Sequence, residues 1–283
     1  ATNEVVSQAS LSYVDGGVPV ITAASWQDAD ANGKIDRVVL TFSEAVNIVD
    51  GNGSDGFGAI LINDGGAVTI DNANYAASSV TSLTLNFSGD EIASTAISGL
   101  SVTYEDAGSN SISDASNEMA DGDVAESYTD AALPAILSTS WQDTDSDGGI
   151  DRAVLTFSES IDITAGNAGD GFGAIVINDG SAVTIDNANY AGSETDGSGN
   201  STLALNFTGD EILGSNISSS TVTYTSSGAN AIKDESSATN EVVSQASLSY
   251  VDGGVPVITA ASWQDADANG KIDRVVLTFS EAV

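Results

Sequence analysis

The chain has 283 residues and carries 41 Asp and Glu against six Lys and Arg, which gives a formal net charge of −35 at pH 7. This negative charge excludes nucleic-acid binding by phosphate neutralisation and disfavours docking on anionic membranes. His and Cys are absent, so the sequence offers no disulfide framework, no thiol nucleophile and no imidazole base. No apolar run reaches the roughly 18 residues that a membrane span needs. We therefore expect a protein that is not an enzyme and does not insert into membranes.

Internal repetition decides the organisation of the chain. Residues 1–46 are identical to residues 238–283. A shorter period lies inside this long one, because a proline, a tryptophan and two phenylalanines of the first repeat recur at an offset of 115. We predict a terminal strand of a preceding repeat (1–17), a first repeat (18–132), a second repeat (133–254) and the opening strands of a following repeat (255–283).

Within each repeat the apolar residues alternate with a period of two, which predicts half-buried β-strands. Asn63-Asp64-Gly65-Gly66 predicts a hairpin turn, and Gly89 to Ile92 is a stretch that could start a short helical turn. About seven short strands in a repeat of about 115 residues predict tandem immunoglobulin-like β-sandwiches, with a β-barrel as the alternative. In the first repeat the alternating runs are 38–42, 60–62, 67–70, 83–87, 100–104 and 124–128.

An acid-rich stretch of nine residues occurs three times, beginning at Asp28, Asp143 and Asp265. Oxygen-bearing side chains occupy positions 1, 3, 5 and 9, glycine occupies position 6, and position 7 would offer its backbone carbonyl, as in an EF-hand calcium loop. Position 12 carries valine in place of the bidentate glutamate, so we expect calcium loops that lack EF-hand helices. The alternative is a solvated acidic turn, which Asp, Asn and Gly favour by themselves. The predicted Ca²⁺ ligands are Asp28, Asp30, Asn32, Lys34 and Asp36; Asp143, Asp145, Asp147, Gly149 and Asp151; and Asp265, Asp267, Asn269, Lys271 and Asp273.

Further ligands must come from outside the loops, and three sets of acids recur between the repeats. Because the first loop of a sandwich lies at the end that faces the next repeat, an ion at the junction is one use for these acids. The sets are Glu44 and Glu159 at the end of the LTFSE strands, Asp90-Glu91 and Asp210-Glu211 in a Gly-Asp-Glu turn, and Asp15, Asp130 and Asp252 before the prolines that open each repeat.

The stretch VPVITAASWQDADANGKIDRVVLTFSEAV, at residues 18–46 and again at 255–283, resembles the opening of tandem immunoglobulin-like repeats in large bacterial and archaeal surface proteins. Those repeats also carry a leading proline, an Asp-rich turn and an LTFSE strand. The acidic loop alone is similar to the calcium loops of dockerins and of thrombospondin type 3 repeats. The resemblance implies a secreted or cell-surface protein with a structural or adhesive role.

Three functions remain open from the sequence. The first is a structural protein whose calcium-stiffened repeats assemble head to tail with copies of itself, by strand addition or covalent continuation, into a filament, stalk or layer. The second is a calcium-dependent adhesin or glycan-binding module, and the third is a surface protein whose acidity is an adaptation to high salt. We expect the ends of the chain to be ordered only where a neighbouring chain or a continuing repeat completes their sandwich.

Overall fold

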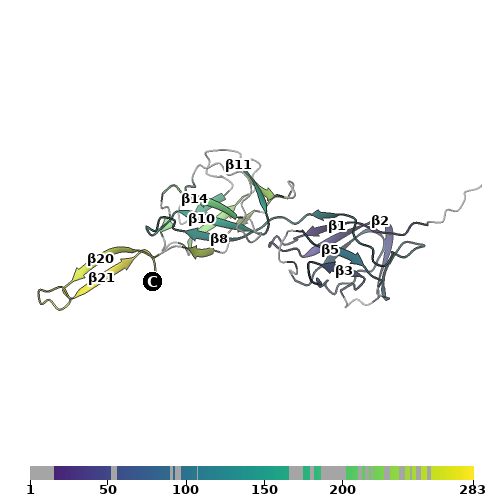
Figure 1. Cartoon of the computed structure of the whole chain (residues 1–283), viewed down its shortest axis with the longest axis horizontal. Helices are drawn as coiled ribbons and strands as arrows, with labels where there is room; N and C mark the ends of the chain where they lie inside the picture. The colour runs from purple at the N-terminus through teal and green to yellow at the C-terminus, as the bar shows by residue number, and fades with distance from the viewer. Residues whose placement is uncertain are drawn as a thin grey trace, which may run out of the picture. The chain divides into compact units, whose positions relative to one another are not determined.

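The computed structural model describes residues 16–51, 56–89, 92, 97–106, 108–165, 175–178, 182–185, 202–209, 212–213, 217, 219–225, 230–235, 240–242, 244–246, 250–253 and 256–283 (Figure 1). All regular elements of these residues are β-strands, which confirms the predicted all-β class. Among them, no helix has the length and hydropathy that a membrane span requires.

The chain divides into two compact units. The first unit draws its described residues from 16–26, 36–89 and 97–129, and the second draws its own from 27–35, 92 and 130–283. Residues 27–35, which include positions 1–8 of the first acid-rich loop, belong to the first repeat in sequence but to the second unit in the structure.

The described strands of the first unit form two sheets. In the larger one β4 pairs with β2, β2 with β1 and β1 with β7, and β6 pairs with the last residues of β2. The register between β2 and β4 shifts after Thr41 and again after Val46, which allows one long strand to serve both neighbours. The strands are β1 (Ile21–Gln27), β2 (Arg37–Asp50), β4 (Ala77–Asn86), β6 (Asn110–Ser113) and β7 (Tyr128–Asp130), and the smaller sheet pairs β3 (Ile60–Asn63) with β5 (Ser101–Tyr104).

The second unit repeats this arrangement. One sheet has the order β14-β10-β8-β19, in which β19 lies parallel to β8, and another has the order β13-β12-β16-β18. Two short pairs, β11 with β17 and β9 with β15, complete it. The strands are β8 (Ile136–Gln142), β9 (Gly149–Ile150), β10 (Arg152–Phe157), β11 (Ile161–Ala165), β12 (Ile175–Asn178), β13 (Ala182–Val183), β14 (Thr202–Asn206), β15 (Ile212–Leu213), β16 (Thr221–Tyr224), β17 (Asn230–Asp234), β18 (Gln245–Ala246) and β19 (Tyr250–Gly253).

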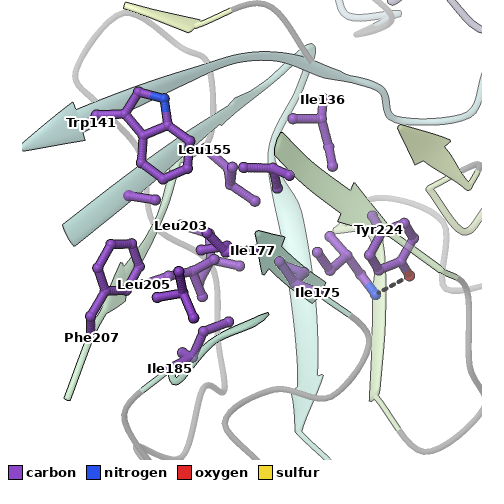
Figure 2. Close-up of a cluster of buried hydrophobic side chains, with 14 of the residues drawn as sticks. Ile136, Trp141, Leu155, Ile175, Ile177, Ile185, Leu203, Leu205, Phe207 and Tyr224 are labelled. Atoms are coloured by element: carbon purple, nitrogen blue, oxygen red, sulfur yellow. Dashed lines mark hydrogen bonds between the residues drawn. The ribbon is translucent and has the colours of Figure 1, made fainter. Parts of the chain in front are cut away.

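The two main sheets of the second unit share one apolar core (Figure 2). The sheet of β8 contributes Trp141 and Leu155, and the sheet of β12 and β16 contributes Ile177 and Tyr224. The buried Tyr224 hydroxyl accepts a hydrogen bond from the backbone N–H of Ile232 at 3.2 Å, so its polar atom is satisfied inside the core. Every second side chain of these strands enters the core, as the period-two alternation of apolar residues predicts.

The predicted strand at 67–70 is not continuous. Ala67 forms a single bridge to Asn63 of β3, and Ile70 forms another to Phe87 at the end of β4. The segment crosses from one sheet to the other, so it can pair with each sheet at only one point. The Gly-Asp-Glu turns, where we expected a short helical turn, include Asp90-Glu91 and Asp210-Glu211, which lie outside the described residues.

The last two strands, β20 (Ile258–Gln264) and β21 (Arg274–Phe279), form an antiparallel hairpin, drawn in yellow in Figure 1. Within the described residues they pair only with each other. Their apolar side chains are largely exposed, including Ile258, Trp263 and Leu277. Of the terminal strand predicted at 1–17, residues 1–15 lie outside the described residues.

Candidate metal sites

The three acid-rich loops share one local conformation. Positions 4 and 6 have positive φ in each copy, with values of 59° at Ala31 and 90° at Gly33 in the first. The side chain of position 1 accepts a hydrogen bond from the N–H of position 6 every time. Because the exposed third copy adopts this turn as well, the nine residues themselves encode it. The bonds join Gly33 to Asp28 (2.7 Å), Gly148 to Asp143 (3.0 Å) and Gly270 to Asp265 (2.7 Å).

The turn brings the carboxylates of positions 1, 3 and 9 together. In each copy these three groups offer oxygen atoms that lie within 4.8 Å of one another. Three carboxylates at this spacing repel one another unless a cation lies between them, and an oxygen-only donor set is what Ca²⁺ prefers. The triads are Asp28, Asp30 and Asp36; Asp143, Asp145 and Asp151; and Asp265, Asp267 and Asp273.

Positions 5 and 7 have other contacts in the loops. The side chain of position 5 accepts a hydrogen bond from the N–H of position 7, and Asp147 is not a member of the carboxylate triad of its loop. The ligand role of position 5 and of the carbonyl at position 7 therefore remains a prediction. The bonds join Lys34 to Asn32 (3.0 Å), Gly149 to Asp147 (2.9 Å) and Lys271 to Asn269 (3.0 Å).

Strands flank the loops, as the sequence predicts. The first loop lies between β1 and β2, the second between β8 and β10, and the third between β20 and β21. Position 12 falls inside a strand in each case, at Val39, Val154 and Val276. A strand leaving the loop carries position 12 away from the turn, so the missing glutamate cannot be replaced from the same segment.

The first and third loops have identical sequences but different electrostatics. Burial raises the pKa of Asp28 above its ordinary value, and the N–H groups of Gly33 and Asn32 offset this only in part. At Asp265 desolvation is again the largest single effect, but the N–H groups of Gly270, Asn269 and Ala268 and the side chain of Asp267 together lower the pKa. A buried carboxylate beside two other acids gains most from a bound cation.

Packing explains this difference in burial. A Cβ atom added at Gly33 would lie 2.6 Å from Leu137 Cδ2 of β8, and one added at Gly148 would lie 2.6 Å from Val257 Cγ2. At Gly270 nothing lies within 4 Å. The first two loops therefore pack, within the second unit, on the opening segment of the repeat that follows each of them in sequence.

Replacing Gly148 with Ala is expected to destabilise the chain more than replacing Gly270 with Ala. Both residues have positive φ, 97° and 85°, so each change strains the backbone by roughly 1–2 kcal/mol. At Gly148 the added methyl group also meets Val257 and Ser280, which adds roughly another 1–2 kcal/mol. Urea unfolding of the two variants measures the difference, and equal losses would contradict the packing of the second loop.

A fourth acidic cluster joins Asp130, Glu159 and Asp234, whose carboxylate oxygens also lie within 4.8 Å of one another. Glu159 and Asp234 are buried, while Asp130 is partly exposed. The side chain of Asn240 holds the segment that carries Asp130, because it donates to the carbonyls of Asp130 (3.2 Å) and Ala132 (2.9 Å). The sequence pointed to Asp130 and Glu159 separately, and the structure brings them together.

Asp234 is a site residue that the sequence analysis missed. Its first-repeat counterpart is Asp114, and each of the two comes a few residues before an Asn-Glu pair. That recurrence is the signal that could have found it, because Asp114 and Asp234 are 120 residues apart, as are Leu83 and Leu203. The offset of 115, which holds for the opening strands, misses the pair because the second repeat has additional residues before Leu203.

Asp130→Asn is expected to stabilise the chain by about 1 kcal/mol at pH 7.5 in excess chelator, after a reduction for partial exposure of the side chain. Desolvation, followed by the charge of Asp234, raises the pKa of Asp130 from 3.8 to about 6. An acid whose pKa is raised in the folded state lowers the free energy of unfolding at pH values above that pKa. This destabilisation disappears as the pH falls from about 6 to below 4. The gain should therefore vanish near pH 3.5 in urea unfolding. A gain that persists there would show that ionisation is not its cause.

The other predicted acids are placed as follows. Glu44 belongs to no acidic triad in the described part of the chain, and Asp15 lies outside that part. Glu281, the third copy of the LTFSE glutamate, has its pKa raised by desolvation and then by the charges of Asp252 and Asp143. A glutamate from one repeat thus lies within electrostatic reach of position 1 of the preceding acid-rich loop.

Comparison with known proteins adds no assignment. No protein-family model matches the chain, and no curated protein matches it in sequence. The evidence for function is therefore the repeats, the strands and the acidic loops themselves.

Proposed function

We propose that the chain is part of a non-enzymatic, secreted or cell-surface structural protein, built from tandem immunoglobulin-like sandwiches that Ca²⁺ stiffens. Such repeats would assemble head to tail into a filament, stalk or layer. Copies of the chain are the proposed partners, and neither nucleic acid nor membrane insertion is part of the proposal.

The strand order supports the immunoglobulin-like part of this proposal. The described strands of the second repeat form two main sheets and two short pairs, and its last strand, β19, pairs in parallel with its first, β8. Two packed sheets with otherwise antiparallel pairs over a shared core are the pattern of these sandwiches. A barrel is less compatible, because the described strands separate into distinct sheets.

The observation that carries the calcium role is the packing of the loops. Each loop gathers three carboxylates, and the loops at Gly33 and Gly148 press on the opening segment of the following repeat. An ion there would neutralise the acids and fix the turn that forms this contact. The same loop could not stiffen an array if it faced solvent on all sides.

The absence of His and Cys and the recurrence of the acids in every repeat support a scaffold over a catalyst. The adhesin alternative needs an exposed aromatic platform or a ligand-binding loop. The tryptophans of the two repeats, Trp26 and Trp141, are buried, so they favour the structural role. A glycan remains the alternative ligand, to be tested directly.

Small-angle X-ray scattering of the chain in millimolar Ca²⁺ and in excess chelator tests the stiffening. We expect a flexible scattering profile in chelator and a rigid one in Ca²⁺. Electron microscopy of concentrated protein in Ca²⁺ should show linear assemblies. Identical scattering in both buffers would contradict the proposal, and specific signals on a glycan array with Ca²⁺ would favour the adhesin.

A further inference from the structure

Two asparagines, one in each repeat, begin a triplet that accepts N-linked sugars. This acceptor triplet is Asn, any residue except Pro, and then Ser or Thr. It occurs as Asn-Phe-Ser at Asn86 and as Asn-Phe-Thr at Asn206, 120 residues further along the chain. Three more acceptor triplets begin outside the described residues, at Asn52, Asn200 and Asn216.

The two described asparagines occupy the same place in the fold. Asn86 is the last residue of β4 and Asn206 the last of β14, and each lies opposite an arginine of the neighbouring strand, Arg37 and Arg152. In the second repeat Arg152 Nε donates a hydrogen bond to Asn206 Oδ1 at 2.8 Å. This bond orients the amide by its oxygen, so Nδ2, the atom that takes the sugar, is left outside it.

The middle residue of each triplet fixes the exposure of the other two. Phe87 and Phe207 are buried, and their rings lie against Trp26 and Trp141 with centroids 6.4 Å apart in both repeats; Figure 2 shows the second pair. Because successive side chains of an extended chain point to opposite faces, the residues on either side of the phenylalanine face outward together. The exposed residues are Asn86, Ser88, Asn206 and Thr208.

Backbone hydrogen bonds hold each triplet from both sides once the repeat has folded. The N–H of the phenylalanine donates to position 9 of the acid-rich loop, and the N–H of the hydroxyl residue donates to a segment on the other side. The asparagine and hydroxyl side chains are not part of these bonds, so the folded repeat has room for a sugar on the asparagine. The bonds join Phe87 to Asp36 (2.8 Å), Ser88 to Thr69 (2.9 Å), Phe207 to Asp151 (2.8 Å) and Thr208 to Thr184 (3.0 Å).

We propose that Asn86 and Asn206 are glycosylation sites, each of which takes a sugar from a lipid diphosphate carrier. The Nδ2 atom forms a bond to C1 of the sugar and the amide gives up one proton. The bond between C1 and the diphosphate oxygen breaks, and the lipid diphosphate leaves with the electron pair. This inference rests on the secreted or cell-surface part of the proposed function, because such transfer acts on exported chains, but it needs neither calcium nor a filament.

Mass spectrometry of peptides from the protein purified from its natural source tests the proposal. Enzymatic removal of the sugar in heavy-oxygen water converts a glycosylated asparagine to a labelled aspartate. We expect the label at Asn86 and Asn206 and none at Asn74, which is also exposed but is followed by Tyr-Ala. Absence of sugar from Asn86 or from Asn206 would overturn the shared assignment.

Protease treatment of intact cells reports separately on export. An exported protein without sugar would refute the glycosylation sites alone, whereas a protein that stays inside the cell and lacks sugar would refute the proposed surface role as well. Sugar on both asparagines without linear assemblies would refute the filament and leave the glycosylation sites intact.

Variants of the full chain, synthesised with membranes that contain an oligosaccharyltransferase and its lipid-linked sugar, test the role of the hydroxyl. Ser88→Ala keeps the backbone bond to Thr69 but removes the acceptor hydroxyl, so sugar should be lost from Asn86 and kept at Asn206. Thr208→Ala should give the reverse, and Ser88→Thr should keep both sugars. An unchanged melting temperature of the unmodified variants checks that the fold is intact. Sugar that persists at Asn86 in Ser88→Ala, or is lost in Ser88→Thr, would contradict the proposal.

Discussion

Removing divalent cations with excess chelator is expected to lower the melting temperature of the chain by about 5–10 °C, and millimolar Ca²⁺ should restore it. At free Ca²⁺ ten times Kd, each site adds about 1.4 kcal/mol. The two packed loops, at Asp28 and Asp143, would thus contribute about 3 kcal/mol, and each kcal/mol shifts the melting temperature of a chain of this size by roughly 2–4 °C. Differential scanning calorimetry makes the measurement.

Sodium chloride at matched ionic strength is the control for general screening of the −35 charge. If sodium chloride alone restores the melting temperature, the result would support an adaptation to high salt and not a structural role for calcium. An unchanged melting temperature in chelator would contradict a structural role for the ion.

Trp141→Ala is expected to cost about 3–5 kcal/mol of unfolding free energy, whereas Trp263→Ala should cost less than about 0.5 kcal/mol. Trp141 is 1% exposed and packs on Phe207 with ring centroids 6.4 Å apart. Trp263 occupies the matching position of the third copy, and its ring is mostly in solvent. Denaturant unfolding of the two variants measures both losses, and it compares the same substitution at matching positions of two hairpins.

A large loss for Trp263→Ala would show that the hairpin is covered in solution. In that case the chain would contain a third packed core, which the described residues do not show.

The sequence predicts the strands with strong alternation and misses those without it. Val38, Leu40 and Phe42 lie at alternating positions of one strand, so their period of two is unmistakable. Strand β6 has one apolar anchor, Ile112, and its pairing with β2 depends on a register shift in the partner. A single apolar residue carries no period, and the shift has no local signal in the sequence.

The acid-rich loops could be predicted because their geometry is local. Hydrogen bonds within nine residues fix the turn, so Asp28, Asp30 and Asp36 converge whatever surrounds them. The cluster of Asp130, Glu159 and Asp234 depends instead on residues up to about a hundred positions apart. Only the packed fold brings those acids together, and the same is true of the contact between Gly33 and Leu137.

Isothermal titration calorimetry of Ca²⁺ into the metal-free chain, at constant ionic strength, tests the central claim of calcium binding by the loops most directly. We expect three ions per chain with Kd values of about 10⁻⁴ to 10⁻³ M. Asp30→Ala should remove one ion and leave the site at Asp145 intact, because the two loops share no ligand. No binding at millimolar Ca²⁺, or loss of all three ions in the single variant, would contradict independent calcium sites in the loops.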